Sequence, residues 1–221
     1  ATLLRDRADC EVKVIDMNSL YKRKCFDEVF SECKLYQPDL IGITALTLSA
    51  RNSYKLAQRL SPLNIPIIGG GLHMSLYPQE ALTHAPFDLI VMDEADESIF
   101  EVVEHYRNGK PNKDIAGISY RDTNGQIIHN ASRPPFRNLD DLPIIDRTLC
   151  DIDDYVVKGN KEDLGIFGIM TTSRGCPGRC TFCSRHGEYD RIYRYMSADR
   201  VFREVLYLRD KFGINYFYFQ E

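Results

Sequence analysis

The sequence has no tryptophan, no apolar run of membrane-spanning length and no excess of basic residues. A helix that crosses a bilayer needs about 20 mostly apolar residues in a row, so the sequence predicts no membrane span. The net charge is −4, whereas nucleic-acid-binding domains usually carry a basic surface. The first residues, ATLLRDRADCEVKV, carry too many charges for a secretory signal peptide. We therefore predict a cytoplasmic protein that has no membrane span and binds no nucleic acid.

A disulfide framework is also disfavoured, because the seven cysteines are an odd number and no secretory signal precedes them. A reducing compartment with thiol or metal chemistry accounts for them better. The cysteines are Cys10, Cys25, Cys33, Cys150, Cys176, Cys180 and Cys183.

The first half of the chain alternates strand and helix patterns. The predicted strands are 11–15, 39–44, 66–69 and 88–92, and the predicted helices are 22–36, 49–60 and 95–106. Alternation of this kind is typical of a doubly wound α/β fold with a parallel sheet. We predict such a domain over residues 1–107, with ligands bound beyond the carboxyl ends of its strands.

The alternation is interrupted after residue 107. Two strands at 115–120 and 126–130 flank Thr123-Asn124-Gly125, which is a strong hairpin-turn signal. The proline-bearing stretch SRPPFRNLDDLPIID follows, so we predict a connector with a β-hairpin over residues 108–163. The alternation resumes over 164–221, with strands at 166–172 and 215–219 and a helix at 197–212. Ser197 is the expected N-cap of this helix, with Arg200 to Glu204 on its solvated side.

Both ends of the sequence lack parts that such domains normally have. Residues 1–8 have the pattern of a helix end, although a doubly wound domain normally opens with a strand. A strand–helix–strand piece at the other end cannot close a barrel or cover both faces of a sheet. We expect that the first strand and the later part of the second domain lie outside the given sequence.

Residues 89–98, LIVMDEADES, place Asp93-Glu94-Ala95-Asp96 after an apolar run, as in DEAD-box RNA helicases. Such enzymes also need a phosphate-cradling G-x-x-x-x-G-K-[ST] loop, and the sequence has none. Carboxylates are favourable at a helix N-terminus, where they meet the positive end of the dipole. We therefore interpret Asp93 to Glu97 as the start of the helix predicted at 95–106.

The stretch with the most specific chemistry is TTSRGCPGRCTFCSRH, residues 171–186. Its C-x3-C-x2-C spacing places three thiols within eight residues, and thiolates suit iron–sulfur clusters and zinc. Three ligands leave one iron of a [4Fe–4S] cluster open, which a catalytic metal site needs. The alternatives are a structural zinc site with His186 as fourth ligand, and unrelated free thiols.

This loop resembles the signature of radical S-adenosylmethionine (SAM) enzymes, including the aromatic residue before the last cysteine. The resemblance implies that Cys176, Cys180 and Cys183 bind three irons of a [4Fe–4S] cluster and that SAM chelates the fourth. It also implies a partial (β/α) barrel that begins near residue 164, cleavage of SAM to a 5′-deoxyadenosyl radical, and Phe182 near the SAM adenine.

The front domain resembles the cobalamin-binding domain that precedes many radical SAM domains. The resemblance rests on Thr44 and Thr47 after one predicted strand, and on Gly69-Gly70-Gly71-Leu72-His73-Met74 after the next. It implies that Thr44, Thr47, Gly69, Gly70, Gly71 and His73 lie at the cobalamin edge. We interpret His73 as a supporting or surface residue in preference to a cobalt ligand. Relatives commonly carry a Gly-Glu-Gly-Glu-like turn where this chain has Asp93 to Glu97.

The first three cysteines could suggest a second cluster, as in methylthiotransferases. Their spacing does not match, and Cys33 falls on the apolar face of the helix predicted at 22–36. Packing as small apolar side chains is the better interpretation.

Together these resemblances imply a cobalamin-dependent radical SAM enzyme that methylates an unreactive carbon of a small molecule or natural product. An oxidative cyclase or rearrangement enzyme is the alternative within this class, and a non-catalytic iron–sulfur electron-transfer or redox-sensing protein is the alternative outside it. The implied electron donor is a reductant such as flavodoxin or ferredoxin. We expect the 221-residue chain to hold its cluster weakly and not to turn over.

Overall fold

The computed structural model describes residues 1–18, 23–150, 167–183 and 191–220. Contacts within the chain divide it into two compact units. We call residues 24–134 the sheet unit, and residues 1–23 with 135–221 the cysteine unit. None of the described helices combines the length and the apolar character needed to cross a membrane.

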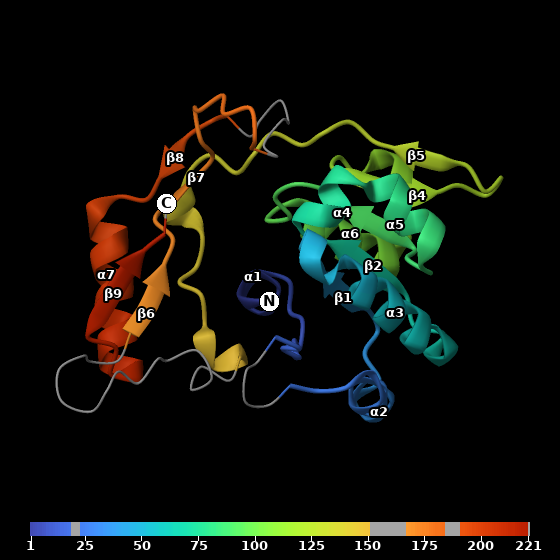
Figure 1. Ribbon diagram of the computed structural model, residues 1–221, viewed down its shortest axis with the longest axis horizontal. Coiled ribbons are helices and arrows are strands. Elements are labelled where there is room, and N and C mark those ends of the chain that lie inside the picture. Colours follow the sequence, from blue (N-terminus) through green and yellow to red (C-terminus); the bar gives the residue numbers. More distant parts are fainter. Residues whose placement is uncertain (19–22, 151–166, 184–190, 221) are drawn as a thin grey trace. The chain divides into compact units, whose positions relative to one another are not determined.

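The sheet unit is built on a five-stranded sheet in the order β1-β2-β3-β4-β5 (Figure 1). The strands are β1 (Ile41–Thr44), β2 (Ile67–Gly70), β3 (Leu89–Val91), β4 (Ile118–Arg121) and β5 (Ile127–His129). The first three are parallel, and the last two are antiparallel. The helices are α2 (Phe26–Tyr36), α3 (Ala50–Leu60), α4 (Leu72–Leu76), α5 (Pro78–His84) and α6 (Ser98–Asn108), with 3₁₀ turns η1 (Thr47–Ser49), η2 (Ser61–Leu63) and η3 (Asn112–Asp114).

Helices cover both faces of this sheet. Side chains alternate between the two faces along a strand. Leu89 belongs to a buried cluster that includes Val102 of α6. The next residue, Ile90, points to the opposite face, where a Cβ on Gly69 would lie 2.5 Å from both Ile90 Cδ1 and Met74 Sδ of α4. Parallel strands with helices on both faces confirm the doubly wound fold predicted for the front of the chain.

The predicted hairpin is confirmed, and it extends the sheet. β4 pairs with β3, with Leu89 opposite Tyr120, and β5 pairs with β4. Arg121 also donates from Nη2 to Leu82 O of α5 at 2.8 Å. The hairpin is therefore part of the sheet unit, whereas the three predicted segments 1–107, 108–163 and 164–221 stay a prediction of domain organisation.

The strand predicted at 11–15 is wrong, because these residues have no strand structure. They belong to the cysteine unit, while β1 to β5 belong to the sheet unit. A strand needs a neighbour to satisfy its backbone N–H and C=O groups, which alternation of side chains cannot supply.

Two predicted helices begin later than expected. α2 begins at Phe26, where Glu28 accepts a hydrogen bond from the backbone N–H of Cys25 at 2.6 Å. α6 begins at Ser98, so Asp93 to Glu97 precede the helix, and Glu97 makes no side-chain cap bond. The acidic residues therefore form the loop after β3 and not the first turn of α6.

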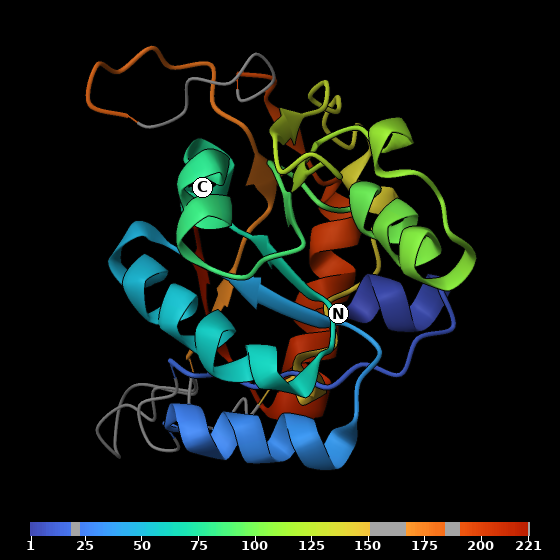
Figure 2. The ribbon, with the colours of Figure 1, turned by 90° about the vertical axis from the view of Figure 1, so that its right-hand side faces the viewer.

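α2 lies alongside α3, as Figure 2 shows. Arg59 of α3 donates from Nε to Asp27 Oδ1 at 2.8 Å, and its guanidinium lies 3.8 Å from the centre of the Phe30 ring. Cys33 is buried on α2. Its burial agrees with the packing role predicted for this cysteine.

The cysteine unit contains α1 (Thr2–Arg7), β6 (Phe167–Met170), β7 (Ser173–Arg174), β8 (Arg194–Tyr195), α7 (Ala198–Phe212) and β9 (Tyr216–Phe219). β6 and β9 are parallel neighbours, and α7 lies beside them (Figure 1). Met170, Leu208 and Ile214 form the buried core of this strand–helix–strand unit.

The helix predicted at 197–212 is confirmed with its N-cap, since Ser197 Oγ accepts from the backbone N–H of Arg200 at 3.2 Å. The solvated position predicted for Arg200 and Glu204 is wrong. Arg200 is 2% exposed and Glu204 5% exposed, and Arg200 Nη1 lies 3.2 Å from Glu204 Oε2. The spacing of charges on a helix does not reveal that a connecting segment covers them.

That segment is residues 136–149, which we call the strap. It contains η4 (Leu139–Asp141) and η5 (Arg147–Leu149). Buried arginines donate to its carbonyls, with Arg200 Nη2 lying 3.1 Å from Pro143 O. Arg147 of the strap itself donates to Ile169 O of β6 at 2.8 Å. The strap is therefore fastened to β6 and α7 through guanidinium groups.

The carboxylate of Asp146, a residue of the strap, accepts hydrogen bonds from several donors. Its carboxylate accepts from the Thr148 hydroxyl at 2.7 Å and from Arg5 of α1 at 2.6 Å. These hydrogen bonds hold the pKa of Asp146 well below its ordinary value.

We expect Asp146→Asn to lower the free energy of unfolding at neutral pH. The folded-state pKa lies below the unfolded one, so the stabilisation is complete above the ordinary aspartate pKa and is lost as pH falls toward the folded value. Denaturant titration at several pH values should show the two proteins converge in acid. Asp39→Asn, at an exposed position in the sheet unit, is the control, and a difference that stays constant with pH would contradict the assignment.

Candidate functional site

The three cysteines of the C-x3-C-x2-C stretch follow β7 directly. β7 pairs with β8, with Ser173 opposite Tyr195 and Arg174 opposite Arg194. Gly175 comes next and has a φ of +82°, a left-handed conformation that glycine adopts readily. The chain therefore turns out of the strand immediately before Cys176.

Two of the three sulfurs lie close to Gly178. Its backbone N–H donates to Cys176 Sγ at 3.4 Å. A Cβ on Gly178 would lie 3.3 Å from Cys176 Sγ and 3.7 Å from Cys180 Sγ. Cys183 follows in a turn in which its N–H donates to Cys180 O at 3.1 Å. Glycine thus lets both thiols flank the same short backbone segment.

The donor set fits an iron–sulfur cluster. Cys176 and Cys180 are exposed and Cys183 is half-buried, so an incoming cluster can reach the sulfurs. In the part of the chain that the structure describes, no three His, Cys, Asp or Glu side chains converge as the ligands of one metal ion do. A [4Fe–4S] cluster makes a different demand, because each thiolate binds a different iron. The ligand roles of the three cysteines stay a prediction.

The other two residues of this loop with a predicted role are Phe182 and His186. Phe182 is 91% exposed, so its ring has little contact with the protein, and its role beside the SAM adenine stays a prediction. His186, the possible fourth zinc ligand, lies outside the described residues.

We expect Gly178→Ala to reduce iron incorporation and to leave the unfolding temperature nearly unchanged. The added methyl would crowd the Cys176 sulfur, while the loop is exposed and contributes little to the core. Iron analysis after anaerobic reconstitution measures the effect. Gly125→Ala is the control in which the added methyl meets no neighbouring atom, since nothing lies within 4 Å of the position that a Cβ would take there. Equal iron content in wild type and Gly178→Ala would contradict the prediction that a methyl beside the Cys176 sulfur reduces iron incorporation.

In the sheet unit, the carboxyl ends of β1 and β2 bring most of the predicted cobalamin-edge residues together. Ala45 N–H donates to Gly70 O at 2.9 Å, and His73 N–H donates to Ala45 O at 3.1 Å. Gly71 has a φ of +87°, and a Cβ there would lie 2.5 Å from Thr44 Oγ1. This edge therefore has no room for a side chain at Gly71.

The three consecutive glycines differ in their surroundings. Gly69 is buried against Ile90 and Met74, so it serves the packing of α4 on the sheet. Gly70 and Gly71 are half-buried at the strand end. Only the latter two lie where a ligand could approach the backbone, and the cofactor-binding role of all three stays a prediction.

His73 is buried among polar groups, at 6% exposure. Its Nε2 lies 3.0 Å from the Tyr54 hydroxyl, and its Nδ1 lies 3.4 Å from Thr47 Oγ1. The Tyr54 hydroxyl in turn donates to Glu80 Oε1 at 3.3 Å, and burial raises the pKa of Tyr54 to about 12. The Tyr54 hydroxyl and both ring nitrogens of His73 are thus engaged within the protein. The role of His73 at the cobalamin edge stays a prediction.

Exposed large apolar residues follow the carboxyl ends of β1 and β2, and we call them the apolar rim. The sequence interpretation did not include them. Leu48 is 100% exposed, and it follows β1. The exposed large apolar residues that follow β1 and β2 are Leu46, Leu48, Leu72, Leu76 and Tyr77. Apolar residues placed directly after the carboxyl ends of parallel strands are the sequence signal that could have found this rim.

The loop after β3 retains a glycine-like backbone despite its acidic sequence. Asp93 has a φ of +55°, and its N–H donates to Ser75 Oγ at 2.9 Å. Aspartate adopts this left-handed region more readily than most residues. A positive φ is therefore present in this loop without a glycine.

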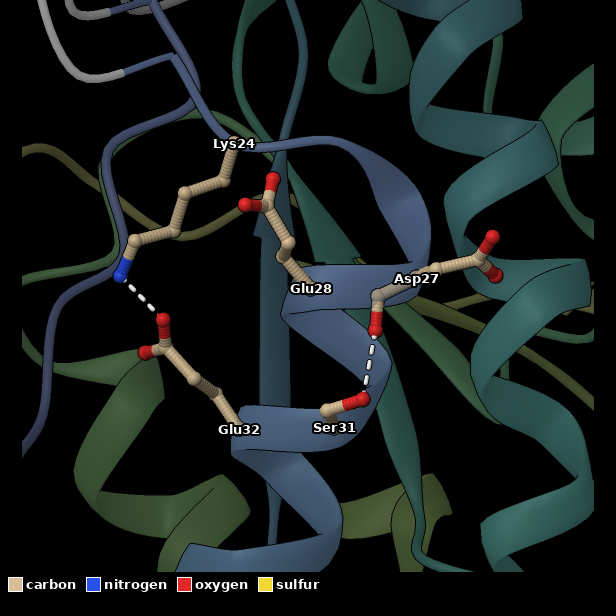
Figure 3. A pocket seen from close by; sticks show the side chains of 5 residues that line it. All are labelled: Lys24, Asp27, Glu28, Ser31 and Glu32. Atoms are coloured by element: carbon tan, nitrogen blue, oxygen red, sulfur yellow. Dashed lines mark hydrogen bonds and ion pairs between the residues drawn. The ribbon is translucent and has the colours of Figure 1, made fainter.

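A shallow hollow lies on α2 and is lined by Lys24, Asp27, Glu28, Ser31 and Glu32 (Figure 3). Lys24 forms an ion pair with Glu32 there, and Ser31 Oγ donates to Asp27 O at 2.9 Å. The Asp27 carboxylate accepts from Arg59, and the Glu28 carboxylate accepts from the backbone N–H of Cys25. None of the predicted site residues belongs to this hollow.

Comparison with known proteins identifies the front of the chain. Residues 1–103 match the protein-family model described as a B12 binding domain. This segment is therefore similar to B12 binding domains. The matched segment includes β1, β2 and β3, and with them the edge formed by Thr44, Gly71 and His73.

The relatives that match most of the chain are named as methyltransferases and cyclases. An uncharacterised methyltransferase of Pyrococcus horikoshii is 32% identical over 97% of the chain and 45% of its own length. The anaerobic magnesium-protoporphyrin IX monomethyl ester cyclase of Cereibacter sphaeroides is 28% identical over 82% of the chain and 30% of its own length. The chain spans less than half the length of these relatives.

A solved structure confirms the fold of both units. The cobalamin-dependent SAM radical enzyme OxsB, with aqua-cobalamin and SAM bound, aligns with 100% of the chain and 30% of its own, with a TM-score of 0.78 and 21% identity. The resemblance to radical SAM enzymes with a B12-binding domain, predicted from the sequence, is confirmed by these findings.

Proposed function

We propose that the chain carries the cobalamin-binding and cluster-binding parts of a radical SAM enzyme that methylates an unreactive carbon of a small molecule or natural product. The observation that carries the proposal is the loop at Cys176, Cys180 and Cys183, with two sulfurs flanking Gly178, in a chain that begins with a B12-binding domain. Methyltransferases among the relatives support the reaction type.

The three cysteines would hold a [4Fe–4S] cluster, and the N–H of Gly178 would stabilise the thiolate of Cys176. When bound, such a cluster leaves one iron open for SAM and supplies the electron for its reductive cleavage, and cobalamin supplies a carrier for the methyl group. Phe182, exposed beside the last cysteine, would pack against the adenine of SAM.

In the B12-binding domain, the residues would act by shape and polarity. Gly70 and Gly71 would let the cofactor approach the backbone, and the hydroxyls of Thr44 and Thr47 would meet its polar substituents. His73 would support this edge through Tyr54 without binding cobalt. The apolar rim would face the apolar surface of the corrin.

An oxidative cyclase or rearrangement reaction is the second candidate, and the cyclase relative favours it. The two reactions differ in the fate of the SAM methyl group. An isotope-labelled methyl group appears in the product of a methyltransferase and is absent from the product of a cyclase. A reductant such as flavodoxin or ferredoxin and the cytoplasmic location remain predictions from the sequence.

The test is metal analysis of protein purified without oxygen from cells supplied with cobalamin. We expect about four irons and about one cobalt per chain, and a change in the EPR spectrum of the reduced cluster when SAM is added. An unchanged spectrum would favour an electron-transfer or redox-sensing protein, because a cluster with four protein ligands has no open iron. Zinc without iron or cobalt would contradict the proposal.

A further inference from the structure

The loop that carries the cysteines is closed at its base by a very short ladder. β7 and β8 contribute two residue pairs, and Met196 N–H adds a bond to Thr172 O at 2.8 Å. Isolated two-stranded pairs are marginal in water, and closing a loop has an entropic cost that grows with its length. Contacts beyond the ladder are therefore needed to hold β8 in place.

Arg194 of β8 provides such contacts from a buried position. The residue is 8% exposed. Its Nη1 donates to Phe136 O of the strap at 2.8 Å, and its Nε donates to Ile192 O at 3.2 Å. The planar fork of a guanidinium can bridge two carbonyls in fixed directions, which an ammonium group cannot do. Arg194 thus joins the end of the cysteine loop to the strap.

A second contact fixes the residues just after β8. Asp140 of the strap accepts from the backbone N–H of Ser197 at 2.8 Å. This hydrogen bond holds the pKa of the Asp140 carboxyl below its ordinary value. β8 is therefore held to the strap at both of its ends.

We propose that Arg194 is a positioning residue for the cluster-binding cysteines. It lies opposite Arg174, which precedes Cys176 by only two residues, so the strap fixes where the cysteine loop leaves the fold. The inference rests on the proposed function, because it assigns Arg194 to the loop that would hold the cluster. Arg194 acts through the backbone of β7 and β8.

The chain offers a matched control in Arg200. It too is buried, at 2% exposure, and it donates to strap carbonyls, with Nη2 lying 3.3 Å from Leu142 O. Arg200 belongs to α7, and it forms no pair in the β7–β8 ladder. Replacing either arginine removes a buried guanidinium that donates to the strap. Only Arg194 belongs to the base of the cysteine loop.

The first measurement is hydrogen–deuterium exchange on the full chain without cluster. We expect Arg194→Ala to speed exchange in peptides covering β7 and β8 about tenfold relative to Arg200→Ala, compared at the same interval below each thermal midpoint. Arg194→Lys should restore part of the protection, because one ammonium can still reach one of the two carbonyls. Equal exchange in the two alanine variants would overturn the proposal. If Arg194→Ala does not fold, Arg194→Lys and Arg194→Gln replace it, with the same comparison to Arg200→Lys and Arg200→Gln.

The second measurement is the rate at which a chelator removes iron from the reconstituted protein. We expect about tenfold faster loss from Arg194→Ala than from wild type, and a rate close to wild type for Arg200→Ala. Equal acceleration in both variants would make Arg194 a general stabiliser and overturn the proposal. A wild type that binds no iron would instead contradict the proposed function, and the exchange measurement would still decide whether Arg194 holds the base of the loop.

Discussion

Cys176→Ala is expected to remove nearly all cluster iron from the protein. Loss of one of three thiolates leaves a [4Fe–4S] cluster with two protein ligands, so iron should fall from about four per chain to below about one. Cys176 is exposed, and truncation of an exposed side chain changes the free energy of unfolding by only about 0.5 kcal/mol. Iron analysis together with a thermal unfolding curve separates loss of the site from loss of the fold. Cys180→Ala and Cys183→Ala should behave in the same way.

Cys25→Ser is the matched control for these variants. Cys25 is also an exposed thiol, but it lies at the N-cap of α2 in the sheet unit. Serine is a favoured N-cap residue, so the replacement should not weaken the helix. Iron content should equal that of wild type. Full iron content in Cys176→Ala, or iron loss in Cys25→Ser, would show that the cluster ligands have been misassigned.

Gly71→Ala should have the second largest effect, and it acts at the cobalamin edge. The new Cβ would lie 2.5 Å from Thr44 Oγ1 and 2.8 Å from Ala45 O, at a φ of +87°. Backbone strain and overpacking each cost about 1–3 kcal/mol, so we expect a loss of about 3 kcal/mol in the free energy of unfolding. Thr44 and Gly71 form the predicted edge, so the affinity for cobalamin should fall as well.

Gly109→Ala separates the two causes. Gly109 has a similar φ of +73° at the end of α6, but nothing lies within 4 Å of the position that a Cβ would take. Only the conformational strain remains, and the expected loss is about 1 kcal/mol. Denaturant unfolding of both variants gives the two free energies. Equal losses would mean that the close approach of Gly71 to β1 contributes nothing.

The sequence predicted those parts of the fold in which local pattern and tertiary packing agree. The large apolar side chains of β1, β2 and β3 are buried, so their composition alone marks these strands. The strand predicted at 11–15 failed because pairing depends on a neighbour elsewhere in the chain. The burial of Arg200 and Glu204 was missed because the strap that covers them lies about 60 positions earlier in the sequence.

The candidate site divides in the same way. The three cysteines of the loop are recognisable because they lie close together in the sequence. The engagement of His73 with Tyr54 joins residues 19 positions apart on two helices, which no local motif encodes. The contact of Arg194 with Phe136 O spans 58 positions, so no local pattern indicates it. These long-range hydrogen bonds are the part of the site that the sequence could not predict and that the structure shows.

The division of the chain into units has a consequence for how the protein is made. The sheet unit is one continuous stretch, whereas the cysteine unit is assembled from residues 1–23 and 135–221. Thr2 Oγ1 accepts a hydrogen bond from the backbone N–H of Asp146, which is synthesised 144 residues later. Domains generally fold as units while the chain emerges from the ribosome. The sheet unit can therefore complete its fold before residues 1–7 reach their native partners in the strap.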